Sequence, residues 1–85
     1  MKKIHFRGHK NMIYGRLRYW REKRGLSQGE LAAQMQVLGV NLDQQMVSKI
    51  ERDERIVTDY ELACFCKILK VPEMELLEDC LKTLE

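Results

Sequence analysis

The chain has few of the residues that metal centres, disulfide scaffolds and membrane proteins need. Its 85 residues include one proline, two histidines and three cysteines. No apolar run approaches the roughly 20 residues needed to span a bilayer, and no apolar segment of a secretory signal follows Met1. Hydrophobic residues make up 45% of the chain and charged residues 33%, as in folded domains. We therefore expect a cytoplasmic protein with one folded domain and no membrane-spanning segment.

The cysteines and histidines lack the spacing of a zinc site. Cys64 and Cys66 are two residues apart in an expected helix, so they point in different directions. His5 and His9 are four apart, but Gly8 breaks any helix between them and no third ligand is near. We expect the cysteines to be reduced and to pack as small apolar residues. Because the sequence has no glycine-rich phosphate loop and no nucleophile beside a base, it predicts no metal, no cofactor and no catalysis.

Positive charge is concentrated at the amino end of the chain. Residues 1–24 contain nine Lys or Arg and one acidic residue, whereas residues 25–85 contain six and twelve. We treat residues 1–10 as a basic tail or arm and residues 11–85 as the folded domain. The basic charge could steer DNA, or serve solubility alone. The arm could enter a minor groove, form a short strand or remain without regular structure.

Two short helices joined by a turn are predicted within residues 27–51. Ser27 and Glu30 have the spacing of a capping box, which starts the first helix at Ser27. Apolar residues then recur at three- and four-residue steps along one face: Leu31, Ala32, Met35 and Leu38. Gly39 can end that helix, and Asp43 can cap the second one.

The second helix has an unusual exposed face. Val47 and Ile50 are expected to point to the core, which leaves two amides, a hydroxyl and an ammonium on the other side: Gln44, Gln45, Ser48 and Lys49. Such groups suit base edges, because glutamine can bond bidentately to adenine and lysine reaches guanine. The alternative is an ordinary solvated polar face.

Three segments resemble the Cro/repressor-type helix-turn-helix domains, also called the XRE-like family. They are LRYWREKRGLSQGELA (Leu17–Ala32), QQMVSKIERDER (Gln44–Arg55) and TDYELACFCKILKVPEMELL (Thr58–Leu77). The resemblance implies an all-α, lambda-repressor-like bundle of five helices. It also implies that Ser27–Leu38 is the positioning helix and that Asp43 to about Arg52 is the recognition helix.

The same resemblance assigns roles to individual residues. It implies that Arg21 and Glu51 form a structural ion pair between the first helix and the recognition helix. Gln28 matches the family position that binds a DNA phosphate. We expect Arg52 and Arg55, in the loop after the recognition helix, to hold the DNA backbone as well.

This chain departs from the family pattern in two places. Between Ala32 and Ser48 it is longer than the compact form by about one helical turn plus a residue. In addition, Asp53 and Glu54 lie between the two expected phosphate-binding arginines, where the family often has a glycine. We expect these acids to cap the helix end or to turn away from DNA.

Three flanking helices complete the expected bundle. The first should start near Asn11 and run to Arg24. Thr58 and Glu61 form a second capping box, and Pro72 is well placed to open a fifth helix. The expected core residues of the first and fourth helices are Ile13, Leu17, Trp20 and Leu26, followed by Leu62, Phe65, Cys66 and Leu69.

The carboxy-terminal segment carries more apolar residues than a small domain needs. Met74, Leu77, Leu81 and Leu84 recur at helical spacing, with Leu76 beside them. We interpret Leu77, Leu81 and Leu84 as a homodimer contact, the alternative being that all of them pack internally.

Together these patterns predict a regulator that binds double-stranded DNA, as a dimeric transcriptional repressor on a palindromic operator. Its recognition helices would enter major grooves about 34 Å apart. The competing hypothesis is a protein-interaction module with the same fold, such as an adaptor or an antitoxin that binds a partner protein.

Overall fold

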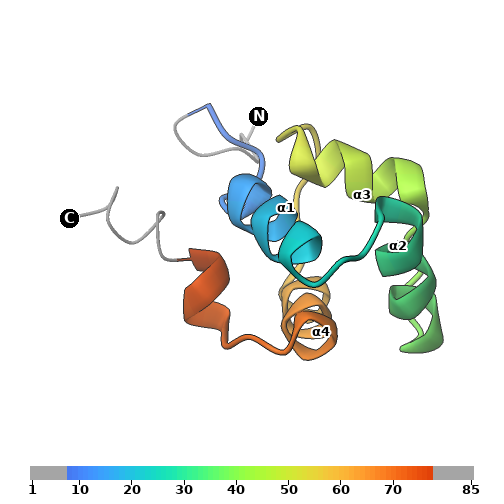
Figure 1. Cartoon of the computed structure of the whole chain (residues 1–85). Coiled ribbons are helices and arrows are strands. Elements are labelled where there is room, and N and C mark those ends of the chain that lie inside the picture. Colours follow the sequence, from blue (N-terminus) through green and yellow to red (C-terminus); the bar gives the residue numbers. More distant parts are fainter. Residues whose placement is uncertain (1–7, 78–85) are drawn as a thin grey trace.

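All regular secondary structure in the described part of the chain is helical. The computed structural model describes residues 8–77, and Figure 1 shows their arrangement. Four helices are α1 (Tyr14–Lys23), α2 (Gln28–Val37), α3 (Gln44–Glu51) and α4 (Asp59–Leu69), and residues 73–77 begin a fifth helix. This confirms the predicted five-helix, all-α fold. No helix among these residues is long and apolar enough to cross a membrane.

Both predicted capping boxes are formed. The hydroxyl of Ser27 accepts the backbone N–H of Glu30 at 3.0 Å, and the Glu30 carboxylate accepts the N–H of Ser27 at 2.8 Å. Thr58 and Glu61 make the same reciprocal pair at 3.3 and 3.0 Å. Two backbone donors at each helix start are therefore satisfied within four residues of sequence, which explains why α2 and α4 begin where predicted.

The predicted start of the first helix near Asn11 is wrong by three residues. The helix begins at Tyr14, with no side-chain cap. Asn11 is buried, and its side-chain oxygen accepts the N–H of Ile13 at 3.1 Å, two residues along and before the helix. Its side-chain nitrogen donates to the carbonyls of Ile50 (3.0 Å) and Arg55 (2.9 Å), at the end of α3 and in the loop after it, so Asn11 joins the segment before α1 to α3 instead of capping α1.

The lengthened turn between α2 and α3 is part of the core. At the end of α2, Gly39 has φ of +87° and donates to the Gln36 carbonyl at 2.9 Å, while Val40 donates to the Met35 carbonyl at 3.0 Å. This is a Schellman motif, for which glycine is favoured at the left-handed position. Val40 and Leu42 then turn inward, and Leu42 is completely buried.

This turn also corrects the predicted core. Leu38 was expected on the apolar face of α2, but it is 38% exposed. Leu42, in the turn, is completely buried, and its carbonyl accepts the side-chain amide of Gln36 at 2.8 Å. The lengthened turn therefore adds a leucine to the core and is held by a hydrogen bond from α2.

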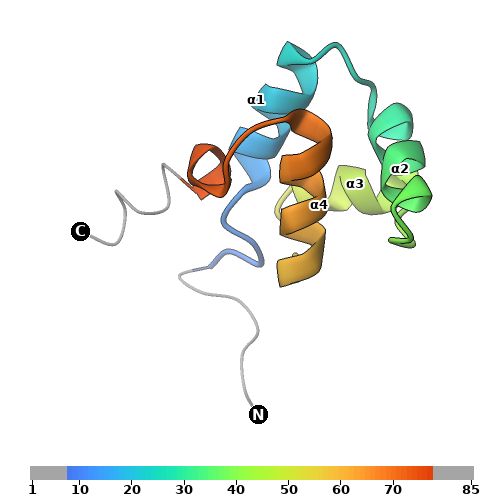
Figure 2. The same ribbon diagram turned by 90° about the horizontal axis from the view of Figure 1, so that it is seen from below.

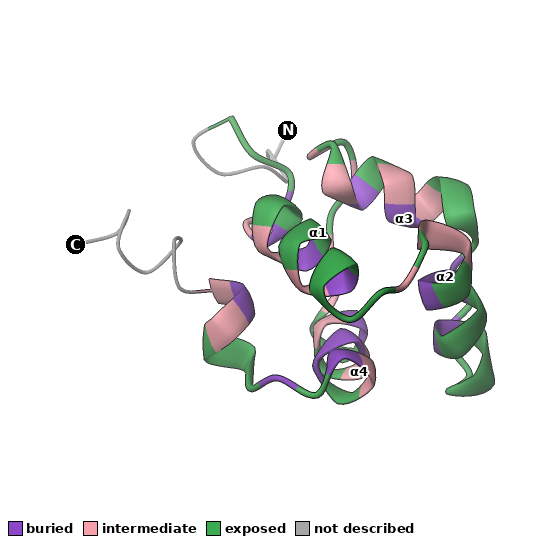
Figure 3. Cartoon of the chain, in the orientation of Figure 1, coloured by how far each residue is buried: buried purple, intermediate pink, exposed green. Residues whose placement is uncertain are grey.

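A single apolar cluster joins the helices. Helices α1 and α2 both pack on α3 and on α4. Figure 2, seen from below, shows α4 in front of α3. Figure 3 shows the buried residues on the facing sides of the helices. The fully buried large side chains are Leu17, Leu31, Met35, Leu42, Val47, Ile50, Phe65, Leu69 and Leu76.

The start of the fifth helix packs on the core through Leu76. Leu76 is completely buried, whereas Met74 is 60% exposed. Leu77 is half-buried and packs against the core, and Leu81 and Leu84 lie outside the described residues. Arg16 of α1 fastens this segment by donating to the backbone carbonyl of Glu75 at 3.0 Å and to its carboxylate at 3.3 Å.

Candidate functional site

The polar residues singled out in the second predicted helix share one face of α3. Gln44, Gln45 and Lys49 are exposed and Ser48 is half-buried. On the opposite side Val47 and Ile50 are completely buried. Residues at these spacings lie on the same side of a helix, one turn apart. The structure thus presents two amides, a hydroxyl and an ammonium together on an outward surface.

The start of α2 lies beside the start of α3. The side-chain Oε1 of Gln44 is 3.7 Å from the point that a β-carbon on Gly29 would occupy. Gln28 and Gly29 are the first two residues of α2, where backbone N–H groups have no partner within the helix. Such N–H groups and the helix dipole favour an anion. The start of α2 therefore flanks the polar face of α3.

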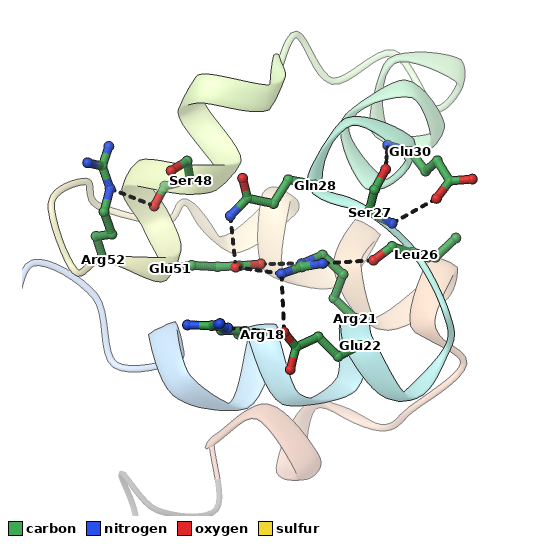
Figure 4. A network of polar contacts seen from close by, with 10 residues as sticks. All are labelled: Arg18, Arg21, Glu22, Leu26, Ser27, Gln28, Glu30, Ser48, Glu51 and Arg52. Atoms are coloured by element: carbon green, nitrogen blue, oxygen red, sulfur yellow. Dashed lines mark hydrogen bonds and ion pairs between the residues drawn. The ribbon is translucent and has the colours of Figure 1, made fainter.

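An ion pair joins α1 to the end of α3 (Figure 4). The Arg21 guanidinium donates from Nε to one Glu51 carboxylate oxygen at 2.7 Å and from Nη2 to the other at 3.0 Å. Its Nη1 donates to the Leu26 carbonyl at 2.8 Å. Gln28 adds a further bond, from Nε2 to the Glu51 carboxylate at 3.1 Å. The structure brings together the two residues that the resemblance paired, and connects Gln28 to them.

This pair is shielded from solvent. The side chain of Arg21 is 10% exposed and that of Glu51 is 4% exposed. The hydrogen bond to Glu51 raises the pKa of Arg21 above its ordinary value, against the opposing effect of burial. The negative charge of Glu51 is therefore balanced inside the fold and does not add a net charge to the outer face of α3.

Arg52, expected to hold a phosphate, lies exposed at the end of α3. Its Nε donates to the Ser48 carbonyl at 3.3 Å, and its guanidinium pairs with Glu54 at 3.5 Å. Both side chains of that pair are more than half exposed. An exposed pair of this kind is weak, so the Arg52 guanidinium can be redirected at little cost.

Arg55, the other arginine expected on the DNA backbone, is engaged inside the fold. It donates to both carboxylate oxygens of Glu61, at 2.9 and 3.0 Å. The bond to Glu61 raises the pKa of Arg55, against burial. Burial alone would raise the pKa of Glu61, but hydrogen bonds from Arg55 and Thr58 outweigh it and lower that pKa. Arg55 thus ties the loop after α3 to the start of α4, a role that sequence reasoning missed.

Asp53 occupies the left-handed position after α3, with φ of +59°. Its carboxylate accepts hydrogen bonds from Nδ1 of His9 (2.6 Å) and from the backbone N–H groups of Lys10 (2.8 Å) and Asn11 (3.1 Å). Partial burial would raise the pKa of Asp53, but these bonds outweigh it and lower the pKa. The Asp53 carboxylate therefore faces residues 9–11 of the amino-terminal segment.

Several amino-terminal arginines have partners within the chain. Besides the pairs of Arg16 and Arg21, Arg24 donates to the carbonyl of Leu69 at the end of α4, at 2.7 Å. Arg18 pairs with Glu22 on the surface of α1, at 3.2 Å. The uneven charge of the sequence therefore overstates the positive charge that α1 presents to a polyanion.

The described residues contain no cluster of three His, Cys, Asp or Glu side chains that could hold a metal ion. Cys66 is buried in the core, and burial raises the pKa of its thiol. A raised pKa keeps a cysteine in its less reactive thiol form.

A family model described as helix-turn-helix matches residues 17–76, from within α1 to the fifth helix. No curated protein matches the chain.

Proposed function

The chain belongs to the XRE-type helix-turn-helix family, and from this premise we propose that it is a sequence-specific transcriptional regulator that represses from a palindromic operator as a dimer. Membership itself makes it a DNA-binding regulator of the XRE type. The observation that carries the finer proposal is the outward face of α3, on which two amides, a hydroxyl and an ammonium gather while the nearby acid Glu51 is buried against Arg21.

Base reading is assigned to the exposed side chains of α3. Gln44 and Gln45 can bond bidentately to adenine, and Lys49 can donate to guanine O6 and N7. Ser48 contacts a base or a phosphate. Because Lys49 is exposed and has no ion-pair partner among the described residues, its ammonium is available to DNA.

Phosphate binding is assigned to the start of α2 and to the loop after α3. The side-chain amide of Gln28 gives one hydrogen to Glu51 and keeps a second for a phosphate oxygen. The N–H groups at the start of α2 can bind the same phosphate. Arg52 is the stronger of the two candidate arginines, because Arg55 already binds Glu61 bidentately.

Dimerisation is assigned to the carboxy-terminal apolar residues Leu77, Leu81 and Leu84. Leu77 is half-buried at the end of the described chain, so it can contact both its own core and a partner. A twofold dimer would place two α3 helices in successive major grooves, about 34 Å apart. A cytoplasmic location is part of the same proposal.

Selection from random duplex DNA at near-physiological salt tests the proposal. We expect enrichment of an inverted repeat with half-sites one helical turn apart. The Lys49→Ala variant should then lose about 1–3 kcal/mol on the selected site and relax the preference at one base pair. Lys67→Ala, which removes an exposed lysine of α4, is the matched control. If Lys49→Ala weakened all sequences equally, lysine would not read a base.

One observation favours the competing function of a protein-interaction module. Val37, at the end of α2, is 86% exposed, and Leu38 beside it is 38% exposed. These two side chains form an apolar projection next to the lengthened turn, of the kind that suits a protein partner. Recovery of no enriched sequence, together with an affinity for DNA that does not fall with salt, would favour this function.

A further inference from the structure

We propose that the groove between the amino-terminal segment and the start of α4 binds an α-amino acid with an aliphatic side chain. The bound amino acid then acts on the loop after α3, and so on DNA binding. Binding of the amino acid itself needs no DNA. Its effect on DNA rests on the proposed function, because it assumes that Arg52, at the start of this loop, holds a phosphate.

The groove has the size and the lining of a small-molecule site. Its volume is about 370 Å³. Sites for small ligands measure about 300–1,000 Å³ and are lined mainly by apolar side chains, with a few polar groups that fix the orientation of the ligand. One wall of this groove is formed by residues 9–13, and the other by residues 57–59 with Leu62 and Leu77. Apolar side chains come from both walls: Met12, Ile13, Val57, Leu62 and Leu77.

This lining favours an aliphatic ligand. Ile13 is buried in the core, whereas Val57, Leu62 and Leu77 are partly exposed and pack against the core. A ligand that covers their exposed atoms removes apolar surface from water, which is favourable. Because no Phe, Tyr or Trp of the described chain lines the groove, an aromatic ligand finds no large ring to stack on there.

One charge of each sign lines the groove. Lys10 belongs to the first wall and Asp59 to the second, and both residues are exposed. Within the described chain they form no ion pair with each other or with any other residue. An amino acid carries the complementary charges on neighbouring atoms. Its carboxylate can bind the Lys10 ammonium and its ammonium can bind the Asp59 carboxylate, which leaves its side chain to the apolar lining.

The first wall is bonded to the loop after α3. The Asp53 carboxylate accepts hydrogen bonds from His9, Lys10 and Asn11, at 2.6, 2.8 and 3.1 Å. The side-chain amide of Asn11 also donates to the carbonyl of Arg55 at 2.9 Å. In Figure 1 the amino-terminal segment accordingly lies beside the carboxy-terminal end of α3.

The second wall is bonded to the same loop. Thr58 caps α4 together with Glu61, whose carboxylate accepts two hydrogen bonds from the Arg55 guanidinium, at 2.9 and 3.0 Å. Arg55 therefore contacts both walls, since its carbonyl binds Asn11 and its side chain binds Glu61. A ligand that bridges the walls should restrict the loop that lies between them.

Restricting this loop should strengthen DNA binding. Arg52 must be held in one place when it binds a phosphate, and a loop that is fixed in advance loses less conformational freedom on binding. Two ligands coupled through one protein typically change each other's affinity by about 5- to 150-fold. We therefore expect the amino acid to raise the affinity for the operator, and the operator to raise the affinity for the amino acid.

Titration with L-leucine, followed in amide NMR spectra of the isotope-labelled chain, tests the site without DNA. We expect a dissociation constant below about 1 mM for so small a ligand. The largest shifts should fall on residues 9–13 and 57–62, which form the groove. The absence of groove shifts at about 10 mM leucine would overturn the proposal. So would groove signals that respond to protein concentration and not to leucine, because a second copy of the chain would then be the occupant.

Two truncated ligands separate the two charges. Isocaproate lacks the ammonium of leucine, and isoamylamine lacks its carboxylate. Lys10→Ala should weaken leucine and isocaproate about three- to fivefold but leave isoamylamine unchanged, whereas Asp59→Asn should weaken leucine and isoamylamine but leave isocaproate unchanged. Both variants keep their local bonds, because the backbone N–H of Lys10 still donates to Asp53 and an asparagine can still accept the N–H of Tyr60. An equal loss for all three ligands in either variant would contradict the assignment of the charges.

Val57→Phe fills the groove and should abolish leucine binding, while circular dichroism verifies that the variant is folded. Val37→Phe is the matched control, because Val37 is 86% exposed and lies outside the groove. On the selected operator, saturating leucine should raise the DNA affinity about fivefold or more in the unsubstituted chain and in Val37→Phe, but not in Val57→Phe. A DNA affinity that leucine leaves unchanged or lowers would overturn the action on the loop.

The two proposals fail separately. If the chain binds leucine in the groove but selects no DNA, the proposed function fails and the amino-acid site stands. If the chain selects an operator but leucine shifts no groove signal, the amino-acid site fails and the proposed function stands.

Discussion

Replacing Glu51 with alanine should destabilise the fold more than any exposed substitution. The change leaves the Arg21 guanidinium, whose side chain is 10% exposed, without the carboxylate that accepts two of its hydrogen bonds. Breaking one side of a buried ion pair costs about 3–5 kcal/mol. Because Arg21 keeps its bond to the Leu26 carbonyl, we expect the lower end, about 3 kcal/mol.

That loss is large for a chain of this size. Domains are stable by about 0.05–0.15 kcal/mol per residue, or roughly 4–13 kcal/mol for 85 residues. Urea unfolding followed by circular dichroism would measure the change. The double variant Arg21→Met/Glu51→Leu replaces both charges with apolar groups of similar size and should recover to within about 1 kcal/mol of the unsubstituted chain.

The control for this experiment is Arg18→Ala, which removes an exposed pair with Glu22 on the same helix and should change stability little. The reasoning would be refuted if Glu51→Ala cost less than about 1 kcal/mol, or if the double variant were as unstable as the single one. DNA binding adds a second criterion. If the pair is structural, the refolded double variant should keep the same preferred bases.

Two further predictions concern the ion pair of Arg55 with Glu61 and the hydrogen-bonded carboxylate of Asp53. The double variant Arg55→Met/Glu61→Gln removes the ion pair but keeps a capping side chain on α4. If the slope of log DNA affinity against log salt concentration is unchanged in this variant, Arg55 does not bind a phosphate. Acid should also destabilise the fold. The pKa values of Asp53 and Glu61 lie below their ordinary values of 3.8 and 4.5, so the stability they contribute is present above those values and is lost as pH falls through the lowered ones. The urea concentration at the midpoint of unfolding should therefore fall as the pH drops below about 4.5, and it should fall less steeply in Glu61→Gln. An equally steep fall in that variant would contradict the assignment.

Local signals in the sequence located most of the helices. Ser27 with Glu30, and Thr58 with Glu61, are three residues apart, so their reciprocal bonds depend only on the chain near them. The end of α2 is likewise local, because Gly39 donates to Gln36 three positions earlier and Val40 donates to Met35 five positions earlier. The exposed face of α3 followed from helical periodicity.

The resemblance, and not the spacing, supplied the one long-range contact that was anticipated. Arg21 and Glu51 are far apart in sequence, and no periodicity connects them. The structure brings them to within 2.7 Å. A family pattern can hold such information because it records which positions are used together in one fold.

Contacts between distant residues were decided by the tertiary structure alone. Asn11 has the chemistry of a helix cap and accepts the N–H of Ile13, but α1 begins only at Tyr14, and the side-chain nitrogen of Asn11 bonds to carbonyls at the end of α3 and in the loop after it. Leu42 lies in the turn where the sequence predicted no core residue, yet it is completely buried. From the sequence alone, Arg55 and Asp53 look like surface charges, and only the packing of the chain brings them to their partners. Composition and spacing describe what each residue can do, whereas the choice among partners depends on which groups the fold leaves buried and unsatisfied.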